Sequence, residues 1–499
     1  MELFPIPVQP PSALSLSQLP GASPEATKAL QEVLSVNHKN HHIIFNDERG
    51  FHNHISHHAL AIWALGGDQN VIRSAYGRFE KYQRKSLDSP EPITSANFND
   101  HLGDRSFWSG YLKFFHDLII VQQKGIPSVL EQYLFSPEAN FGVKNSVGEH
   151  PQMLSRLVDG LLHPAIHLGY GAEFGLPGMI VEGLAQTAVH RTELSPVIPA
   201  SMFVNKSVSS SVENLASRLQ TATFVTPKDN LSSDGTHAFT ILARILKDPG
   251  MKIRDGPGSD PGVIISYVMK NHGDALFKYA MAWDVDTSDP TKLNRKIAEL
   301  QWLNTILYAL SGFKRGQGDK FHADFFNMHL VTSSIFLPSI VALLTPASQE
   351  VFLRAYLVAC LAWYIARGRP DIDIEPFFTA NTALPSLGVK APVNSLALLP
   401  ASHPSATNPN PWLPIIQQAI LHQDDHVAKI QRALAHHAKV YGSRVAGLPD
   451  FANTELPGAD KLDGTLFIRA AGLTAQRLGR DFGSEDQVSY WDRTPFFKD

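Results

Sequence analysis

The stretch Phe51-His-Asn-His-Ile-Ser-His-His-Ala-Leu-Ala-Ile-Trp-Ala-Leu-Gly-Gly67 contains both the pattern that indicates the fold class and the first candidate functional residues. Its apolar residues recur at helical spacing, and Gly66-Gly67 suits the end of a helix. His54 and His58, four residues apart, would share one helix face, and His57 is three residues from His54. The stretch therefore predicts an apolar helix that carries several imidazoles.

The same helical periodicity continues through most of the chain, and alternating β-branched segments are nearly absent. A short extended piece is expected only at 197–204. Further helices are expected at 107–123, 126–134, 151–163, 181–190, 236–246, 262–283, 289–312, 324–344, 348–367, 411–441 and 467–478. The sequence therefore predicts an all-α fold, a large multi-helical single body with few or no strands.

Proline, glycine and serine mark the expected boundaries of this body. Residues 1–24 are rich in proline and serine and are expected to form an extended arm, because Ser23 suits an N-cap and Pro24 the first helical position. Residues 25–499 are expected to form one catalytic helical domain. The stretch 384–411, rich in proline and asparagine, is expected to be an exposed connection or an active-site lid.

Composition excludes several classes of partner. The 499 residues are 43% hydrophobic and 18% charged, as in a globular protein. The net charge of −4 and the lack of a dense Lys/Arg run argue against nucleic acids and anionic membranes as partners. A small molecule is the expected partner, and a homodimer is compatible with the sequence.

The cellular location follows from cysteine usage and from the apolar runs. The single cysteine, Cys360, lies in an apolar segment, so an intramolecular disulfide is impossible and thiolate ligation of a metal is disfavoured. The N-terminus does not resemble a signal peptide, and no uninterrupted apolar run approaches ~18 residues. We expect a cytoplasmic protein that does not span a membrane.

Two further segments add histidines in apolar surroundings. His163 and His167 are four residues apart, with Pro164 placing the start or a bend of a helix at His163. His322 and His329 lie seven apart and are expected to share a helix face, although the span of ~10 Å makes it hard for both to bind one ion. One pair alone is a weak signal, but several apolar segments whose imidazoles converge would build a metal site.

The other histidines have plainer interpretations. His38, His41 and His42 lie in a polar stretch and are expected at the surface, and His436 and His437 fit an exposed helix face. Near the last of these helices, Asp425 and Lys429 are spaced for a helical ion pair. The alternative is a buried Lys429 that loses its charge, or becomes a carbamate, and binds a metal.

The motifs of common cofactor-dependent enzymes are missing. The nearest match to a dinucleotide fingerprint, Gly169-Tyr-Gly-Ala-Glu-Phe-Gly175, has the wrong spacing and follows a helical segment instead of a strand. There is no phosphate-binding Walker loop, no Gly-x-Ser-x-Gly elbow and no His-Glu-x-x-His zinc motif. A flavin or nicotinamide fold is not supported.

Four segments together resemble the questin oxidase-like proteins of fungal aromatic polyketide pathways. They are Phe51-His-Asn-His-Ile-Ser-His-His58 with the helix that follows, His163-Pro-Ala-Ile-His-Leu-Gly-Tyr-Gly-Ala-Glu-Phe174, Asp324-Phe-Phe-Asn-Met-His-Leu-Val-Thr-Ser333, and Asp425-His-Val-Ala-Lys429 with Arg432. The resemblance spans about residues 37–441. It implies oxidative opening of anthraquinone-type rings, described as Baeyer–Villiger-like and often as NADPH-dependent.

This resemblance and the histidine pattern together give one site hypothesis. Non-heme iron, as Fe2+, would bind O2 beside an aromatic polyketide and explain ring cleavage without flavin. The expected metal ligands are His58, His163, His167 and His329, and the expected catalytic or alternate groups are His54 and Lys429. Phe325, Phe326 and Trp63 are candidates to flank a flat substrate, and Glu173 or Asp324 to orient an imidazole.

Two other functions remain open from the sequence. In the first, the protein is a metal-free, NADPH-dependent Baeyer–Villiger monooxygenase in which the histidines act as general acids and bases. In the second, it is a non-catalytic helical binding protein whose histidines serve packing. Metal content and oxygen uptake distinguish the three functions.

Overall fold

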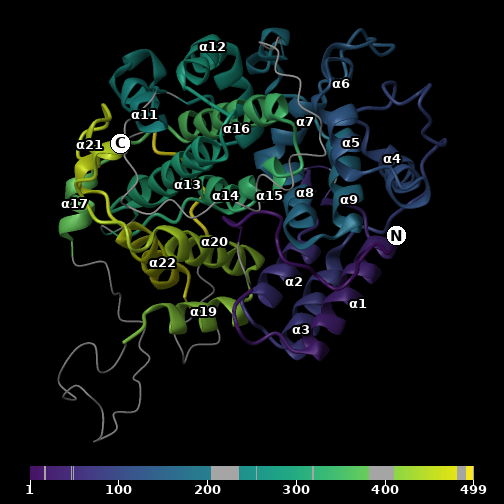
Figure 1. Ribbon diagram of the computed structural model, residues 1–499, viewed down its shortest axis with the longest axis horizontal. Helices are drawn as coiled ribbons and strands as arrows, with labels where there is room; N and C mark the ends of the chain where they lie inside the picture. The colour runs from purple at the N-terminus through teal and green to yellow at the C-terminus, as the bar shows by residue number, and fades with distance from the viewer. Residues whose placement is uncertain are drawn as a thin grey trace, which may run out of the picture.

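The computed structural model describes residues 1–15, 18–46, 48, 50–203, 235–253, 256–316, 318, 320–380, 409–479 and 490–497. Helices dominate this part of the chain and form one body (Figure 1), so the all-α prediction is confirmed. The helices are α1 (Pro24–Asn40), α2 (Ile55–Ala64), α3 (Gln69–Phe79), α4 (Trp108–His116), α5 (Ile126–Leu130), α6 (Pro137–Phe141), α7 (Met153–Val158), α8 (His163–Phe174), α9 (Pro177–Ala188), α11 (Ala238–Lys247), α12 (Pro261–Ala282), α13 (Pro290–Gly312), α14 (Phe325–Ser334), α15 (Leu337–Val341), α16 (Pro346–Ala366), α17 (Ile374–Thr379), α19 (Trp412–Leu421), α20 (Asp425–Tyr441), α21 (Pro449–Ala452) and α22 (Thr465–Leu478).

Many helix starts follow from short polar residues placed before a proline. Ser23 accepts a hydrogen bond from the Ala26 backbone at 3.1 Å, directly before Pro24. Asp260 and Asp289 cap α12 and α13 in the same way, each followed by a proline. These caps satisfy backbone N–H groups that have no partner inside the helix. They explain why most helix starts could be placed from the sequence.

The central helices α8, α9 and α16 are buried on nearly every face. All twelve residues of α8 and all twelve of α9 are buried. The two helices pack closely because a Cβ at Gly183 would lie 2.8 Å from the Leu168 backbone nitrogen. α16 is long and apolar enough to cross a membrane, but 94% of its apolar window is buried, as expected of a core helix.

Two strands and a turn carry the first histidines toward the centre. β1 (Ile44–Asn46) and β2 (Phe51–His52) pair antiparallel, with Ile44 opposite His52, and α2 begins three residues later. The predicted extended piece at 197–204 is wrong over its described part. Residues 195–197 and 200–203 form single 3-10 turns instead, each beginning at or beside a proline.

Three predicted helices are interrupted. In the 151–163 segment α7 ends at Val158, and a 3-10 turn at 160–162 precedes α8. The 411–441 segment divides into α19 and α20, and Asp424 caps the second helix by accepting from the His426 backbone at 2.8 Å. The 324–344 segment divides into α14 and α15, and Asp324 caps α14. His322 therefore precedes the helix, and the prediction that it shares a helix face with His329 is wrong. Of the expected lid at 384–411, residues 384–408 lie outside the described residues.

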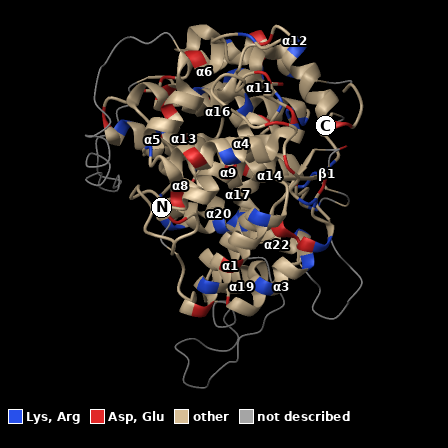
Figure 2. Cartoon of the chain, turned by 90° about the vertical axis from the view of Figure 1, so that its right-hand side faces the viewer, with Lys and Arg blue, Asp and Glu red and all other residues tan. Residues whose placement is uncertain are grey.

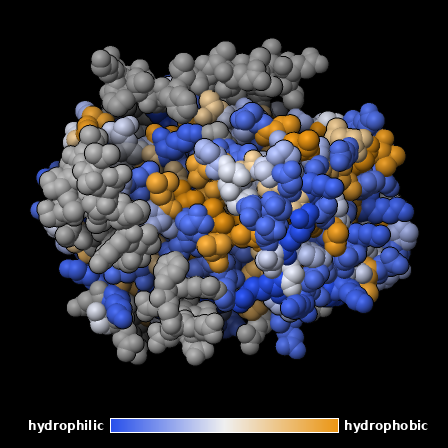
Figure 3. All heavy atoms as spheres, turned by 90° about the horizontal axis from the view of Figure 1, so that it is seen from below, coloured by the Kyte–Doolittle hydropathy of each residue, from blue (hydrophilic) through white to orange (hydrophobic). Residues whose placement is uncertain are grey.

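The N-terminal residues lie along the helical body. Leu3 accepts from Gly178 at 2.7 Å and Val8 donates to Phe174 at 3.0 Å, which ties this segment to α8 and α9. Basic and acidic residues are interspersed along the helices and loops of the cartoon in Figure 2. On the face seen in Figure 3, apolar side chains gather among the polar ones. A groove of about 960 Å³ lies between α19, α20 and the N-terminal segment, lined in part by Leu19, Trp412 and Leu413.

Candidate metal centre

A left-handed turn places His163 at the start of α8. Gly160, Leu161 and Leu162 all have positive φ, at 54°, 58° and 65°. Non-glycine residues adopt this region at a cost, and such strain is frequent beside functional sites. The turn directs the Gly160 carbonyl at His163, whose Nδ1 lies 2.7 Å from it. A Cβ at Gly160 would overlap the His190 ring, so the turn also requires glycine there.

Four imidazoles from distant parts of the chain form a closed ring. We call His54, His163, His329 and His426 the histidine ring. Their successive ring centroids are 4.9 Å apart between His54 and His163 and 4.9 Å between His163 and His329. They are 5.2 Å apart between His329 and His426 and 4.8 Å between His426 and His54. The ring joins the N-terminus of α2 to α8, α14 and α20, which pack against one another.

Each member of the histidine ring is held through its Nδ1 atom. His163 Nδ1 donates to the Gly160 carbonyl, and His329 Nδ1 donates to the Phe325 carbonyl at 2.7 Å. His54 Nδ1 lies 2.8 Å from Asp425, and His426 Nδ1 lies 3.1 Å from Asp424 and 3.2 Å from Asp425. An acceptor at Nδ1 fixes the tautomer that leaves Nε2 as a metal ligand, and metal-binding histidines are usually held this way.

The Nε2 atoms show what this arrangement can bind. His54 Nε2 and His163 Nε2 are 2.8 Å apart. The Nε2 atoms of His329 and His426 are buried and, among the described residues, have no hydrogen-bond partner. A buried polar atom without a partner is costly, and a shared cation would satisfy several of them together. The donor set, imidazole nitrogen, suits iron, zinc and copper. The histidine ring therefore fits a transition-metal ion.

Asp425 links the histidine ring to Lys429. Its Oδ2 atom lies 2.7 Å from Lys429 Nζ, so the predicted helical ion pair is present. Donor atoms of His54, Asp425 and His426 also lie within 4.8 Å of one another. Asp425 thus accepts from both imidazoles and the ammonium and holds the ring in place.

Burial sets the protonation of these imidazoles. Desolvation and then the charge of Lys429 lower the pKa of His54 to about 3, and desolvation holds the pKa values of His163 and His329 well below their usual range. Neutral imidazole is the form that binds metals. His426 differs: burial is the largest single effect and lowers its pKa, but the charge of Asp425 and the hydrogen bonds to Asp424 and Asp425 together outweigh burial and raise the pKa. A cation at His426 would compete with this proton.

Two of the expected metal ligands lie outside the histidine ring. His58 packs against Phe79 with ring centroids 5.3 Å apart, and its two buried nitrogens find no hydrogen-bond partner in the part of the chain that the structure describes. His167 Nδ1 lies 3.0 Å from His57 Nε2, and its own Nε2 lies 2.6 Å from Glu182. Both nitrogens of His167 are thus engaged within the protein. Of the six predicted site residues, His54, His163 and His329 lie in the ring and Lys429 lies beside it.

A chain of hydrogen bonds leads outward from His167. Glu182 accepts from His167 with one oxygen and lies 2.6 Å from His38 Nδ1 with the other. His38 keeps 16% of its side chain exposed. We call His57, His167, Glu182 and His38 the relay chain. The prediction that His38 is simply a surface residue is therefore wrong in part.

Several other sequence interpretations are changed by burial. His42, His436 and His437 are expected at the surface but are buried, because each lies at a contact between helices or loops that its own segment does not reveal. Trp63 packs on Phe174 and donates to Thr27, within the core.

The residues predicted to flank the substrate or to orient an imidazole differ in their contacts. Phe325 contacts the rings of His329 and His426, at 4.9 and 5.0 Å. Phe326 stacks instead on Trp363. Glu173 pairs with Arg432 and does not contact the histidine ring. Asp324 caps α14 and lies 2.7 Å from Arg367 and 3.6 Å from His322.

His426 is the member that the sequence reasoning did not select as a ligand. Its spacing to Lys429 fits a helix contact. His422 lies four residues before it, but the residues between them, Gln423, Asp424 and Asp425, are polar. The available signal was its place in the Asp425-His-Val-Ala-Lys429 segment. Local spacing could not show it, because its ring neighbours lie on α2 and α14.

Comparison with known proteins covers the part of the chain that contains the histidine ring. The questin oxidase-like family model matches residues 51–434, which include the whole histidine ring and well over half of the chain. The chain belongs to the questin oxidase-like family. The resemblance drawn from the sequence is therefore confirmed.

Curated relatives of this questin oxidase-like protein are named as oxidases. It is 29% identical to a Baeyer-Villiger oxidase of Pestalotiopsis microspora, over 84% of this chain and 82% of the relative. It is 27% identical to the oxidoreductase AflY of Aspergillus parasiticus, over 91% and 83%. It is 26% identical to a questin oxidase of Aspergillus terreus, over 82% and 80%. The chain is accordingly an oxidoreductase.

Proposed function

We propose that this protein is a non-heme, iron-dependent oxygenase that uses O2 to cleave the ring of an anthraquinone-type polyketide in fungal secondary metabolism. The observation that carries the proposal is the histidine ring, with Nδ1 held at all four imidazoles and, within the described ranges, Nε2 unpartnered at His329 and His426. The names of the relatives, questin oxidase and Baeyer-Villiger oxidase, support the reaction type.

The ligands of the proposed ion are His54, His163, His329 and His426. Iron bound by imidazole nitrogens, when present, allows O2 to react with an electron-rich aromatic ring. Asp425 and the backbone carbonyls of Gly160 and Phe325 keep the four imidazoles oriented. His58 and His167 remain a prediction as ligands, and the carbamate of Lys429 remains a hypothesis.

The substrate itself is proposed to supply the electrons, as the hydroquinone form of the anthraquinone. One hydroquinone and one O2 molecule together supply all the atoms and electrons of one ring-opened product. The bond between a former carbonyl carbon and the neighbouring aryl carbon breaks. The first carbon becomes a carboxyl group and the second gains a hydroxyl, so both oxygen atoms enter the product. NADPH would be needed only to form the hydroquinone beforehand.

The protein side chains would orient this substrate and move its protons. Phe325 offers an aromatic face beside two ring imidazoles. The His57 ring lies 5.7 Å from His54 and begins the relay chain, which ends at the partly exposed His38. Protons that reach His57 thus have a hydrogen-bonded path toward the surface.

Elemental analysis combined with oxygen uptake tests the proposal. We expect about one iron per chain in wild type, and O2 consumption with an anthrahydroquinone in the absence of NADPH. With isotopically labelled O2, mass spectrometry should find both labelled atoms in the product. His329→Ala should lose iron and activity together, while His116→Ala, on the surface of α4, should retain both.

Two results would contradict this function. Full activity in iron-free protein that requires NADPH and incorporates one oxygen atom would indicate the metal-free monooxygenase. Tight binding of the quinone without any turnover in air, and without a bound metal, would indicate a binding protein.

A further inference from the structure

Two histidines outside the histidine ring lie beside one of its members. The His52 ring stacks on the His163 ring, with centroids 4.0 Å apart and planes 9° from parallel. The alternation of strand β2 turns His52 inward, where it is 7% exposed, and leaves Phe51 outside. His52 Nε2 lies 3.2 Å from Nε2 of His190, a residue that follows α9. A stacked imidazole and its hydrogen-bond partner thus cover one face of a proposed metal ligand.

The bonding of His190 sets the direction of the hydrogen bond between these two rings. The Arg191 backbone N–H donates to His190 Nδ1 at 2.9 Å, so that nitrogen carries no proton. Burial and then the charge of Arg105 lower the pKa of His190 to about 3, so the ring is neutral at neutral pH and its proton lies on Nε2. His190 Nε2–H therefore donates to His52 Nε2 and holds the His52 ring in its place on His163.

The left-handed turn before α8 closes these contacts into a loop. A Cβ at Gly160 would overlap the His190 ring, so the glycine packs directly against this imidazole. The Gly160 carbonyl in turn lies 2.7 Å from His163 Nδ1. One glycine thus supports His163 at its edge through the carbonyl, and on its face through His190 and His52. We call Gly160, His190 and His52 the imidazole clamp.

The imidazole clamp opposes the two motions by which His163 could turn away from a bound ion. Rotation about the bond between Cβ and Cγ would drive the His163 ring into His52, and tilting of the ring would break the hydrogen bond to Gly160. The His163 ring also gains positive charge when its Nε2 binds a cation, and the π face of a neutral aromatic neighbour attracts such charge. Groups that orient a metal ligand commonly change metal affinity by about 10–100-fold.

We propose that His52 is a positioning residue of the metal centre, which acts through its stack on His163 and is itself held by His190. This inference rests on the proposed function for the presence of a metal ion, but not for the reaction with O2. His52 binds no metal in this arrangement, because its Nε2 accepts from His190 and its ring lies face to face with the ligand. The clamp is therefore a support of the ligand set and not an extension of it.

Anaerobic titration of the metal-free protein with Co2+, whose visible absorption reports the geometry of its ligands, tests the proposal without turnover. We expect His52→Ala to weaken Co2+ binding roughly tenfold and to shift the absorption band, because His163 becomes free to rotate. His52→Phe keeps a flat ring of similar size on His163 and should bind within about threefold of wild type, with an unshifted band. This rescue by a ring without nitrogen separates stacking from metal ligation.

Two further variants control the comparison. His101 stacks on Phe107 with centroids 3.8 Å apart and planes 11° from parallel, a pair that includes no member of the histidine ring. His101→Ala therefore removes a stack of the same geometry and should bind Co2+ as wild type does. His190→Ala removes the anchor of His52 without changing strand β2, and its Co2+ affinity should lie between those of His52→Ala and wild type. It takes the place of His52→Ala if that variant does not fold.

The possible results separate this inference from the proposed function. Equal Co2+ affinity in wild type, His52→Ala and His190→Ala would overturn the clamp even where the iron-loaded wild type consumes O2. An equal loss in His52→Phe and His52→Ala would overturn the stacking role, and so would a wild type that does not bind Co2+. If the affinities follow the expected order while the iron-loaded wild type consumes no O2, the clamp stands and the proposed function fails.

Discussion

At the scale of single residues, the informative property of each histidine is the occupation of its two nitrogens. Spacing along a helix predicts both His58 and His163 as metal ligands. The structure separates them, because His163 is held through Nδ1 with Nε2 directed at His54, whereas His58 packs against Phe79 without a polar partner. A ligand needs both an orienting acceptor and a shared target.

This distinction predicts different effects of two alanine substitutions. His426→Ala should lower the iron content of the purified protein by at least tenfold, because removing a ligand commonly costs more than altering the groups that orient it. His58→Ala should leave iron near the wild-type level and reduce stability modestly. Mass-spectrometric metal analysis of both variants, prepared in parallel, gives the answer. The reverse order of iron contents would restore His58 as a ligand and exclude His426.

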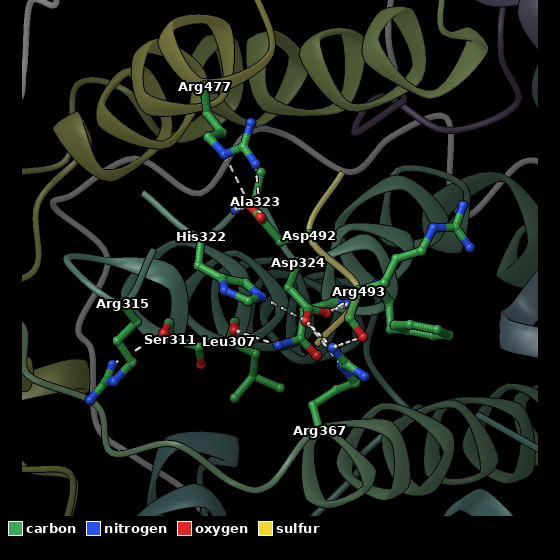
Figure 4. A network of polar contacts seen from close by, with 12 residues as sticks. Leu307, Ser311, Arg315, His322, Ala323, Asp324, Arg367, Arg477, Asp492 and Arg493 are labelled. Carbon is green, nitrogen blue, oxygen red and sulfur yellow. Dashed lines mark hydrogen bonds and ion pairs between the residues drawn. The ribbon is translucent and has the colours of Figure 1, made fainter. Parts of the chain in front are cut away.

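Buried charge pairs should be stable only as pairs. Arg367 and Asp324, 2.7 Å apart with side chains 2% and 0% exposed, join α16 to the cap of α14 (Figure 4). Arg367→Met should lower the free energy of unfolding by about 3–5 kcal/mol, because Asp324 would keep an unpaired buried charge. Arg244→Met, which breaks the exposed pair with Glu455, should cost at most about 1 kcal/mol. Denaturant titration compares them, and equal losses would contradict the argument.

At the scale of elements, the relay chain joins α1 to α8 and α9. Burial alone would raise the pKa of Glu182, but hydrogen bonds from His167 and His38 lower it to about 2. Burial lowers the pKa of His38, and Glu182 overcomes this and raises it. The ionised Glu182 carboxylate therefore stabilises the folded protein at pH values above its unfolded pKa. The protonated His38 imidazole does so at pH values below its own unfolded pKa.

The pH dependence of stability follows from these two directions. The contribution of Glu182 is complete above about pH 4.5 and is lost as the pH falls toward 2, while that of His38 is complete below about 6.5 and is lost as the pH rises through its raised pKa. The stability deficit of Glu182→Gln should therefore be largest near pH 5–6, at about 2–4 kcal/mol. Thermal unfolding from pH 6 to 3 should show this deficit shrinking on acidification. A deficit that stays constant as the pH falls would contradict the coupling.

At the scale of the whole molecule, the histidine ring connects residues that are far apart in the chain. His54, His163, His329 and His426 belong to four segments that meet only in the folded state. An ion bound by all four would bind the folded protein in preference to the unfolded chain, and such binding adds stability by mass action.

Metal removal should therefore lower the melting temperature. We expect chelation to cost about 3 kcal/mol if the ion is present at about a hundred times its dissociation constant. Restoring Fe2+ should recover the wild-type transition, measured by calorimetry. The same chelator should leave His426→Ala unchanged. A chelator effect of equal size in that variant would place the ion elsewhere.

The fold class was predictable because helix formation is encoded locally. Apolar spacing and caps such as Ser23 with Pro24 involve neighbouring residues, so helix positions could be read without tertiary contacts. The breaks between α14 and α15 and between α19 and α20 were missed. At the first break the apolar residues Ile335 and Phe336 continue the pattern, because both sides are buried in the core. At the second, the polar residues Gln423 and Asp424 mark the break, and Asp424 caps α20.

The candidate centre was predictable only in part. His54, His163 and His329 were selected because each lies in apolar company, and that property is visible in the sequence. The place of His426 beside them, the alternative bonding of His167 with Glu182, and the stacking of His52 on His163 all depend on contacts across the molecule. Local periodicity determines which segments become helices. The packing of α2, α8, α14 and α20 decides which imidazoles share a centre, because the direction of a side chain between packed helices depends on all of those helices.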